Sequence, residues 1–373
     1  MGRELTAERV RRDVEVLARG GMDIVTFCAE FTASLQRAMP SCASCVATLD
    51  PATNLLTGGF KYGDIEGRDE FDEQWGLVEY GQVEPTSFTE LAHADVPAAG
   101  VHHATGGDVR RSARMRDLIL PNLDCADELR LVARVSGRAW GGIALFGEQP
   151  FDAEDVAFVA SLSEALATGL RAGILARLTL APSSAVTGPA VIVVGADDEI
   201  SQLSAGAQAR LDELGLRGHT VTPQAVLGAL VAGARRYGAG LTDALPRGRV
   251  HLPSGRWLVL HASPLSSPGG ATGDVVVTIE DARPPEILPL VAAAFALTGR
   301  ERDVIGLVLQ GIGTTQIAAT LHLSAYTVQD HLKSVFEKSG VSSRRELVSR
   351  VFLGQYAPRL GAEIAPSGWF LDD

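Results

Sequence analysis

Polar residues near the C-terminal end of the sequence share one face of a short expected helix over residues 325–338. The polar set is Tyr326, Gln329, Asp330 and Lys333. The apolar set on the opposite side is Val328, Leu332, Val335 and Phe336. Amide, carboxylate and ammonium groups at the N-terminal half of such a helix can hydrogen-bond base edges in the DNA major groove. The same spacing also fits an ordinary solvated face, and periodicity alone leaves both interpretations open.

Other residue types that could do chemistry give weaker signals. Cys42 and Cys45 have the spacing of half a zinc site or a redox pair, but the other two cysteines supply no second pair, so small residues beside a buried strand are expected. His102 and His103 have no helical or strand offset, which favours loop histidines over metal or haem ligands. No glycine-rich phosphate loop, nucleophile elbow or His-Glu-x-x-His motif occurs. We therefore expect no enzyme activity, no metal site and no cofactor.

Four expected helices over residues 298–353 position the polar face. Thr298 and Glu301 have the spacing of a capping box that opens the first helix, and Gly311 ends it. A tight turn at His322 precedes Ser324, the expected N-cap of the third helix. Two short helices joined by such a turn are typical of a helix-turn-helix arrangement. The second, third and fourth helices are expected at 313–321, 325–338 and 343–353.

The charge distribution fits a nucleic-acid contact at this end of the chain. Residues 296–354 carry seven Lys or Arg against five Asp or Glu, whereas the whole chain has a net charge of −12. The longest apolar run, 225–234, is ten residues, whereas a membrane span needs about 20. The N-terminus lacks a secretory apolar stretch, and four cysteines are too few for a disulfide framework. A cytoplasmic protein with no membrane contact is expected.

The anchor residues of these helices resemble the C-terminal DNA-binding domain of LuxR/FixJ-type transcription regulators. The anchors include Leu297-Thr-Gly-Arg-Glu301, Ile317-Ala318, Thr327-Val328, His331-Leu332, Gly340-Val341 and Glu346-Leu347. The resemblance implies a four-helix domain that binds double-stranded DNA as a homodimer. It places the third helix in the major groove and the fourth at the dimer contact.

By position, the resemblance implies a set of DNA-binding residues. Those facing bases are Gln329, Asp330 and Lys333, and those near phosphates are Thr314, Thr315, Thr327 and Arg344. The predicted set is completed by Ser324, Tyr326 and Lys338. The chain departs from the family where Gly313-Thr-Thr-Gln316 replaces a common Ser-Asn-Lys-Glu and where Gln329 replaces a common Lys. Two fewer cations predict weaker non-specific affinity and a smaller salt dependence.

The upstream sequence predicts two α+β regions. Strands are expected at 43–49, 139–146, 190–194, 250–252, 257–260 and 274–280, and long helices at 8–37 and 154–178. The apolar stripe on the second helix fits either docking on its own sheet or pairing with a second copy of the chain. Both interpretations stay open.

Two loop-like stretches predict the domain boundaries. Residues 181–189 are small, polar and bounded by prolines, and Pro284-Pro285 ends an apolar run. The predicted fold is multidomain, with two α+β sensor domains followed by an all-α four-helix helix-turn-helix domain. The predicted ranges are 1–180, 186–284 and 286–355, with a tail at 356–373.

The upstream regions resemble sensor domains. Gly137–Phe146, followed by Pro150–Asp155 and a long helix, resembles the last part of a GAF domain. Val191–Leu265 resembles a PAS domain. Such domains bind a small-molecule effector or transmit a signal, so the sequence predicts a ligand- or signal-responsive DNA-binding transcription regulator.

Two other functions fit parts of the sequence. The segments 191–198 and 243–248 superficially resemble a response-regulator receiver, but the residues before Asp243 do not form a buried apolar strand. The second alternative is a protein-interaction scaffold whose C-terminal helices bind protein rather than DNA.

Overall fold

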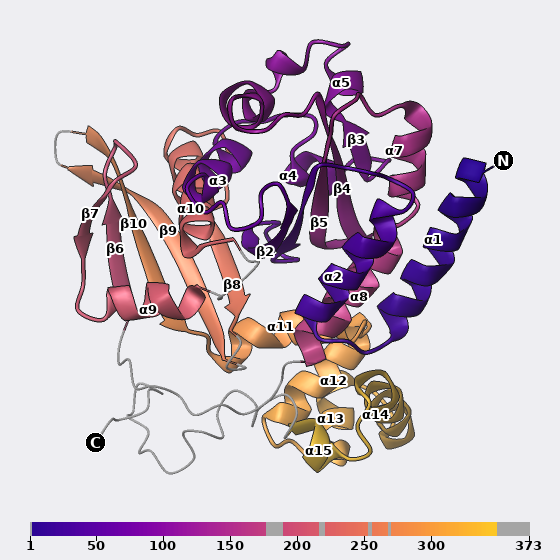
Figure 1. Cartoon of the computed structure of the whole chain (residues 1–373). Coiled ribbons are helices and arrows are strands. Elements are labelled where there is room, and N and C mark those ends of the chain that lie inside the picture. Colours follow the sequence, from indigo (N-terminus) through magenta and orange to yellow (C-terminus); the bar gives the residue numbers. More distant parts are fainter. Residues whose placement is uncertain (1, 177–188, 216–220, 253–255, 268–269, 349–373) are drawn as a thin grey trace. The chain divides into compact units, whose positions relative to one another are not determined.

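The computed structural model describes residues 2–176, 189–215, 221–252, 256–267 and 270–348, and the chain divides into two compact units (Figure 1). The first unit comprises Met1–Ala176, Gly188–Val250 and Leu258–Glu280. The second comprises Arg177–Thr187, His251–Trp257 and Asp281–Asp373. Both upstream regions therefore contribute to the first unit. The expected linker at 181–189 lies almost entirely outside the described residues.

The first of two five-stranded sheets has the strand order β2-β1-β5-β4-β3, and its neighbouring strands are all antiparallel. Its strands are β1 (Ala43–Leu49), β2 (Leu56–Gly63), β3 (Ala98–Gly100), β4 (Asp127–Val135) and β5 (Arg138–Gly147). The strands expected at 43–49 and 139–146 are confirmed as β1 and β5. β4 and β5 are buried along most of their length. The sequence of β5 is almost continuously apolar, whereas β4 also carries the buried charged residues Asp127, Glu128 and Arg130.

Helices cover both faces of this sheet. α8 packs on β4 and β5, and α1 and α2 pack on α8 (Figure 1). A Cβ at Gly141 would lie 2.5 Å from Leu170 of α8, whereas one at the next residue, Gly142, would lie 2.5 Å from Phe88 of α4. Successive residues of a strand face opposite sides, so these glycines let helices approach both faces closely. The bounds are α1 (Gly2–Arg19), α2 (Ile24–Gln36), α4 (Phe88–Leu91), α7 (Ala153–Ala160) and α8 (Ser163–Ala176).

The two long helices expected from periodicity are each broken, so both predictions are wrong in this respect. The segment 8–37 divides into α1 and α2 at Gly20-Gly21, where Gly21 has φ +65° and Asp23 caps the new helix by accepting from the Val25 and Thr26 amides. The segment 154–178 divides into α7 and α8. The break lets the Ser163 hydroxyl donate to the Val132 carbonyl of β4 at 2.7 Å.

The apolar stripe on this second segment packs within the first unit. Its central residues, Val159, Leu162, Leu166 and Leu170, are at most 1% exposed. The central part of the stripe therefore docks on its own sheet, whereas Leu178 at its end lies outside the described residues.

The second sheet repeats the strand order of the first. Its order is β7-β6-β10-β9-β8, so in each sheet the strands lie second, first, fifth, fourth and third by chain order. Its strands are β6 (Ala190–Val194), β7 (Ile200–Leu203), β8 (Arg247–His251), β9 (Trp257–Ser267) and β10 (Gly270–Asp281). The strand expected at 190–194 is confirmed as β6, and the one expected at 250–252 begins earlier, as β8. β9 and β10 contain the strands expected at 257–260 and 274–280 and extend further. α9 (Ala207–Leu214) and α10 (Pro223–Gly238) lie between β7 and β8 in the chain.

α10 contacts α3 (Asp72–Gly81) with the two backbones touching. A Cβ at Gly76 would lie 2.1 Å from the Ala225 carbonyl oxygen, and one at Gly228 would lie 2.5 Å from the Glu73 carbonyl oxygen. Only glycine permits this approach at either position. The short helical segments that complete the first unit are α5 (Val101–Ala104), η1 (Val109–Arg111), η2 (Arg114–Ile119, a π-helix) and α6 (Leu120–Asn122).

The described part of the second unit is helical from residue 284 onward. Its helices are α11 (Pro284–Ala294), α12 (Gly299–Leu309), α13 (Thr314–Leu321), α14 (Ala325–Ser339) and α15 (Arg344–Val348). Pro284 and Pro285 thus open a helix at positions where proline costs no hydrogen bond. The tail at 356–373 lies outside the described residues. None of the helices in the described ranges is long and apolar enough to cross a membrane.

Candidate nucleic-acid interface

The core of the second unit fixes the orientation of α14. Val328, Leu332 and Val335 of α14 are at most 4% exposed, and Ile317 and Ala318 of α13 are buried as well. α14 contacts both α12 and α13. Burial of one side of α14 necessarily turns the opposite side outward.

A left-handed residue and a side-chain cap shape the turn between α13 and α14. His322 ends α13 with φ 53° and ψ 46°. Ser324 then accepts a hydrogen bond from the Thr327 amide at 3.0 Å, and the two hydroxyls lie 2.8 Å apart. The Ser324 hydroxyl therefore satisfies one orphan amide at the start of α14. This arrangement confirms the expected tight turn and N-cap.

The outward face of α14 is polar. Tyr326 is 77% exposed, and Gln329, Asp330 and Lys333 are exposed on the same helix. Asp330 and Lys333 form no ion pair within the described residues. Their charges are therefore presented to solvent rather than to each other.

The first turn of α13 lies beside this face. The Gln329 Nε2 atom donates to the Thr314 hydroxyl at 3.4 Å, which joins the two helices. Thr314 is half-buried, and Thr315 is exposed. The predicted base-facing residues thus lie beside Thr314, Thr315 and Thr327, whereas Arg344, also predicted to face phosphate, lies on α15.

Lys338 is held by a buried acid. Glu301 is 4% exposed, and its carboxylate accepts from the Lys338 ammonium at 2.7 Å and 2.8 Å and from the Ser334 hydroxyl at 2.7 Å. Glu301 also forms the expected capping box with Thr298. Burial by itself raises the pKa of Glu301, but the hydrogen bonds from Lys338, Thr298 and Ser334 outweigh it and lower that pKa to about 2. The exposed residue Lys338, which is also predicted to contact DNA, therefore joins α14 to α12 through its ammonium group.

Arg344 also makes contacts within the domain. Its Nη2 atom donates to the Val308 carbonyl at 3.4 Å and to the Ile312 carbonyl, at the end of α12. A cation at this place satisfies orphan carbonyls and is stabilised by the helix dipole. The next residue, Arg345, is exposed and has no ion pair among the described residues. Arg345 is not in the predicted DNA-binding set, although its position next to Arg344 could have suggested it.

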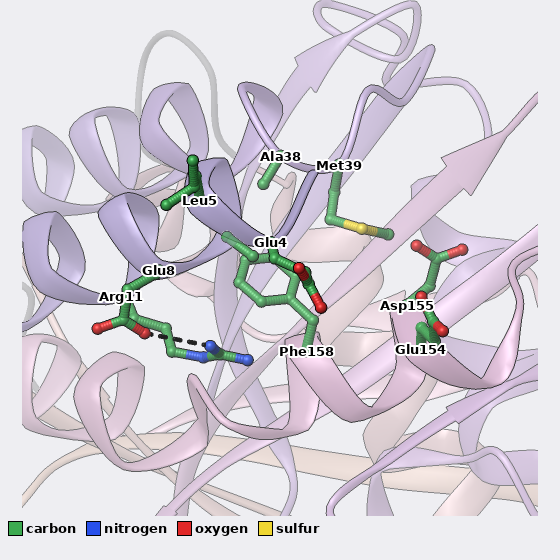
Figure 2. Close-up of a pocket in the computed structure, with 10 residues that line it drawn as sticks. Glu4, Leu5, Glu8, Arg11, Ala38, Met39, Glu154, Asp155 and Phe158 are labelled. Atoms are coloured by element: carbon green, nitrogen blue, oxygen red, sulfur yellow. Dashed lines mark hydrogen bonds and ion pairs between the residues drawn. The ribbon is translucent and has the colours of Figure 1, made fainter. Parts of the chain in front are cut away.

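A groove in the first unit has the wrong charge for DNA. It has a volume of about 750 Å³ and lies between α1, the residues that follow α2, and α7 (Figure 2). Its carboxylates are Glu4, Glu8, Glu154 and Asp155. Arg11 lies over the Phe158 ring at 5.3 Å and pairs with Glu8 at 3.4 Å, so its charge is already engaged. Phosphates would be repelled here.

The described residues offer no cluster of three or more His, Cys, Asp or Glu side chains that could hold a metal ion. Burial raises the pKa of the Cys45 thiol to about 12, and that of Cys125 to about 12 as well. These thiols therefore stay protonated at neutral pH and are weak nucleophiles.

Comparison with known proteins assigns the helical domain. The family described as "Bacterial regulatory proteins, luxR family" matches residues 296–351. This range contains the capping box, the turn and the polar face of α14. Residues 296–351 are therefore a LuxR-type helix-turn-helix domain.

Relatives of this domain are named as transcriptional regulators. The monoamine regulon transcriptional regulator of Klebsiella aerogenes is 36% identical over 86 residues, which is 20% of this chain and 38% of that protein. The regulator MalT of Klebsiella pneumoniae is 36% identical over 64 residues, which is 17% of this chain and 7% of that protein. The matches thus span well under two thirds of these relatives.

Solved structures of VqmA from Vibrio cholerae were also found. One, described as a dimer without target DNA and as a LuxR-type receptor, has 19% identity and a TM-score of 0.21, and the match covers 44% of this chain and 82% of that chain. A second, described as a complex with ligand and DNA, has 18% identity and a TM-score of 0.23, covering 46% and 85%. Scores this low establish no shared overall arrangement.

Proposed function

We propose that the chain is a DNA-binding transcription regulator that reads a specific double-stranded site as a homodimer. The observation that carries the proposal is the outward face of α14, where Tyr326, Gln329, Asp330 and Lys333 are exposed while the other side is buried. Such side chains can hydrogen-bond base edges once α14 enters the major groove. The LuxR-type domain at 296–351 supports the same conclusion.

The first unit is proposed to be the sensory part. In this proposal the first sheet with its helices is a GAF-like domain and the second sheet is a PAS-like domain. They bind a small molecule or pass a signal to the helix-turn-helix domain, and the chain acts in the cytoplasm without catalysing a reaction. Light scattering on the purified full chain tests the homodimer, and a monomeric mass at tens of micromolar would contradict it.

Selection of bound DNA from random oligonucleotides by the full chain tests the function. We expect enrichment of one two-fold symmetric site, since a dimer reads paired half-sites. Gln329→Ala should weaken binding to that site, whereas Gln208→Ala, which changes an exposed glutamine on α9 of the first unit, should leave binding unchanged. Failure to enrich any site at low salt would favour the alternative of a protein-binding scaffold.

A further inference from the structure

A small cavity in the first unit is walled by both upstream regions. It lies between the first sheet and α3, and Val221 and Ala225 close it from the start of α10. Trp75, Phe88 and Leu56 supply much of its apolar wall. Its volume is about 60 Å³, which exceeds the space of a single water molecule but is smaller than a cavity that holds benzene.

The four charged side chains at the cavity are paired with one another. The Lys61 ammonium contacts the Asp72 carboxylate at 3.1 Å, and Arg130 donates to Glu79 at 2.6 Å. All four side chains are at most 8% exposed. A charged guest would lack a counter-ion in this buried space, and burial of an unpaired charge costs far more than burial of an uncharged group. An uncharged, mostly apolar guest avoids that cost.

Two hydrogen bonds attach the wall on the α10 side, one to the first sheet and one to α3. The Val221 amide donates to the Gly59 carbonyl of β2 at 3.0 Å. The Thr222 amide donates to the Asp72 carboxylate at 2.7 Å. Asp72 thus binds both Lys61 on the cavity wall and Thr222, which immediately precedes α10. A guest that changes the position of Lys61 or Asp72 therefore also affects how α10 packs on α3.

We propose that this cavity is a ligand site for a small uncharged molecule with a short carbon skeleton, such as a short-chain alcohol or ketone, and that the guest strengthens the docking of α10 on α3. A ligand at this site would be the signal for the sensory role proposed above, and only this biological role depends on that proposal. Binding itself is a property of the first unit and is measured without DNA. A failed DNA selection would therefore not contradict the ligand site, and a failed ligand titration would not contradict DNA binding.

The test uses the full chain labelled with 5-fluorotryptophan and 2-propanol as the probe. The fluorine signal of residue 75, assigned by its loss in Trp75→Phe, should shift and reach a plateau as 2-propanol is added. Isopropylammonium, which has the same carbon skeleton and a positive charge, should give no saturable shift. A linear response to 2-propanol, or an equal saturable response to isopropylammonium, would overturn the proposed site.

Cavity variants and hydrogen exchange complete the test. Ala144→Val narrows the cavity and should abolish the saturable shift, whereas Leu56→Ala enlarges it and should bind isobutanol several-fold more tightly than the wild type does. Leu5→Ala removes an exposed leucine outside the cavity and serves as the matched control. Hydrogen exchange across 223–238 should slow several-fold with 2-propanol bound. Unchanged exchange there would overturn the coupling to α10, and wild-type binding by both cavity variants would overturn the site.

Discussion

The ammonium of Lys338 lies 2.7 Å and 2.8 Å from the two carboxylate oxygens of Glu301, so the last turn of α14 is joined to the first turn of α12. Glu301 is buried and at the same time completes the capping box of α12. One carboxylate therefore sets both the start of the first helix of the domain and the position of the helix predicted to read DNA.

Glu301→Gln should destabilise the helix-turn-helix domain, because the amide cannot replace the carboxylate toward Lys338. Folding lowers the pKa of Glu301 to about 2, so its contribution is fully present above the unfolded carboxyl pKa and is lost as the pH falls toward 2. The expected loss at neutral pH is on the order of 2–3 kcal/mol. Denaturant unfolding of the full chain followed by a probe in this domain measures it.

The pH dependence separates the ion pair from a simple packing effect. Between about pH 5 and pH 2 the wild type should lose stability more steeply than Glu301→Gln, since only the wild type takes up a proton at this site on unfolding. Glu337→Gln changes an exposed acid on α14 and is the control. If the unfolding free energies of wild type and Glu301→Gln changed equally with pH, the stabilising role of the ionised Glu301 would be contradicted.

Lys333 and Arg344 should behave differently on substitution, although both belong to the predicted DNA-binding set. Lys333 is exposed on the predicted base-facing side, so Lys333→Ala should weaken binding to the selected site and, because a cation is lost from the DNA contact, reduce the slope of log K against log salt by about 1. Arg344 donates to the Val308 and Ile312 carbonyls, so Arg344→Ala should mainly lower the unfolding midpoint. Binding titrations at several salt concentrations and thermal unfolding of both variants distinguish the two roles. Equal slopes and equal affinities for wild type and Lys333→Ala would contradict a contact of Lys333 with DNA.

The sequence predicted the C-terminal domain well because its determinants are local. The capping box of Thr298 and Glu301, the cap at Ser324 and the apolar spacing of α14 each act within a few residues. The Lys338–Glu301 pair joins residues 37 positions apart, and no spacing rule reveals it. For the same reason the family resemblance implies a phosphate contact for Arg344 but could not show the two carbonyls that Arg344 contacts.

Periodicity failed where a tertiary contact interrupts a helix. The stripe on 154–178 has helical spacing throughout, yet the chain turns at Ser161 so that Ser163 reaches β4. The contact of α3 with α10 was equally hidden, because Gly76 and Gly228 look like helix-weakening residues until the two backbones are seen to touch. The cavity depends on the same long-range packing.

Gly76→Ala should destabilise the first unit. The new Cβ would lie 2.1 Å from the Ala225 carbonyl oxygen, which is backbone and cannot rotate away, so the cost should reach at least about 1–3 kcal/mol. Gly81→Ala on the same helix is the matched control. A Cβ there meets nothing within 4 Å, and alanine is the better helix former, so stability should be unchanged or slightly higher. Thermal unfolding of the full chain compares them, and equal effects of the two variants would show that α3 and α10 do not touch in solution.

Asp330 provides the sharpest test of base reading. It is exposed on α14 between Gln329 and Lys333, without an ion pair to Lys333. An acid beside phosphates weakens binding to every sequence unless it makes a specific contact, and a carboxylate can accept a hydrogen bond from the cytosine amino group, worth on the order of 1–3 kcal/mol of discrimination. We expect Asp330→Asn to change the preferred base at one position of each half-site, toward adenine, whose N6 and N7 atoms suit an amide. Sites selected in parallel by the wild type and by Asp330→Asn measure this, with Glu337→Gln on α14 as a control for the loss of an exposed negative charge. Uniformly tighter binding by Asp330→Asn with an unchanged site would show that the residue only repels phosphate.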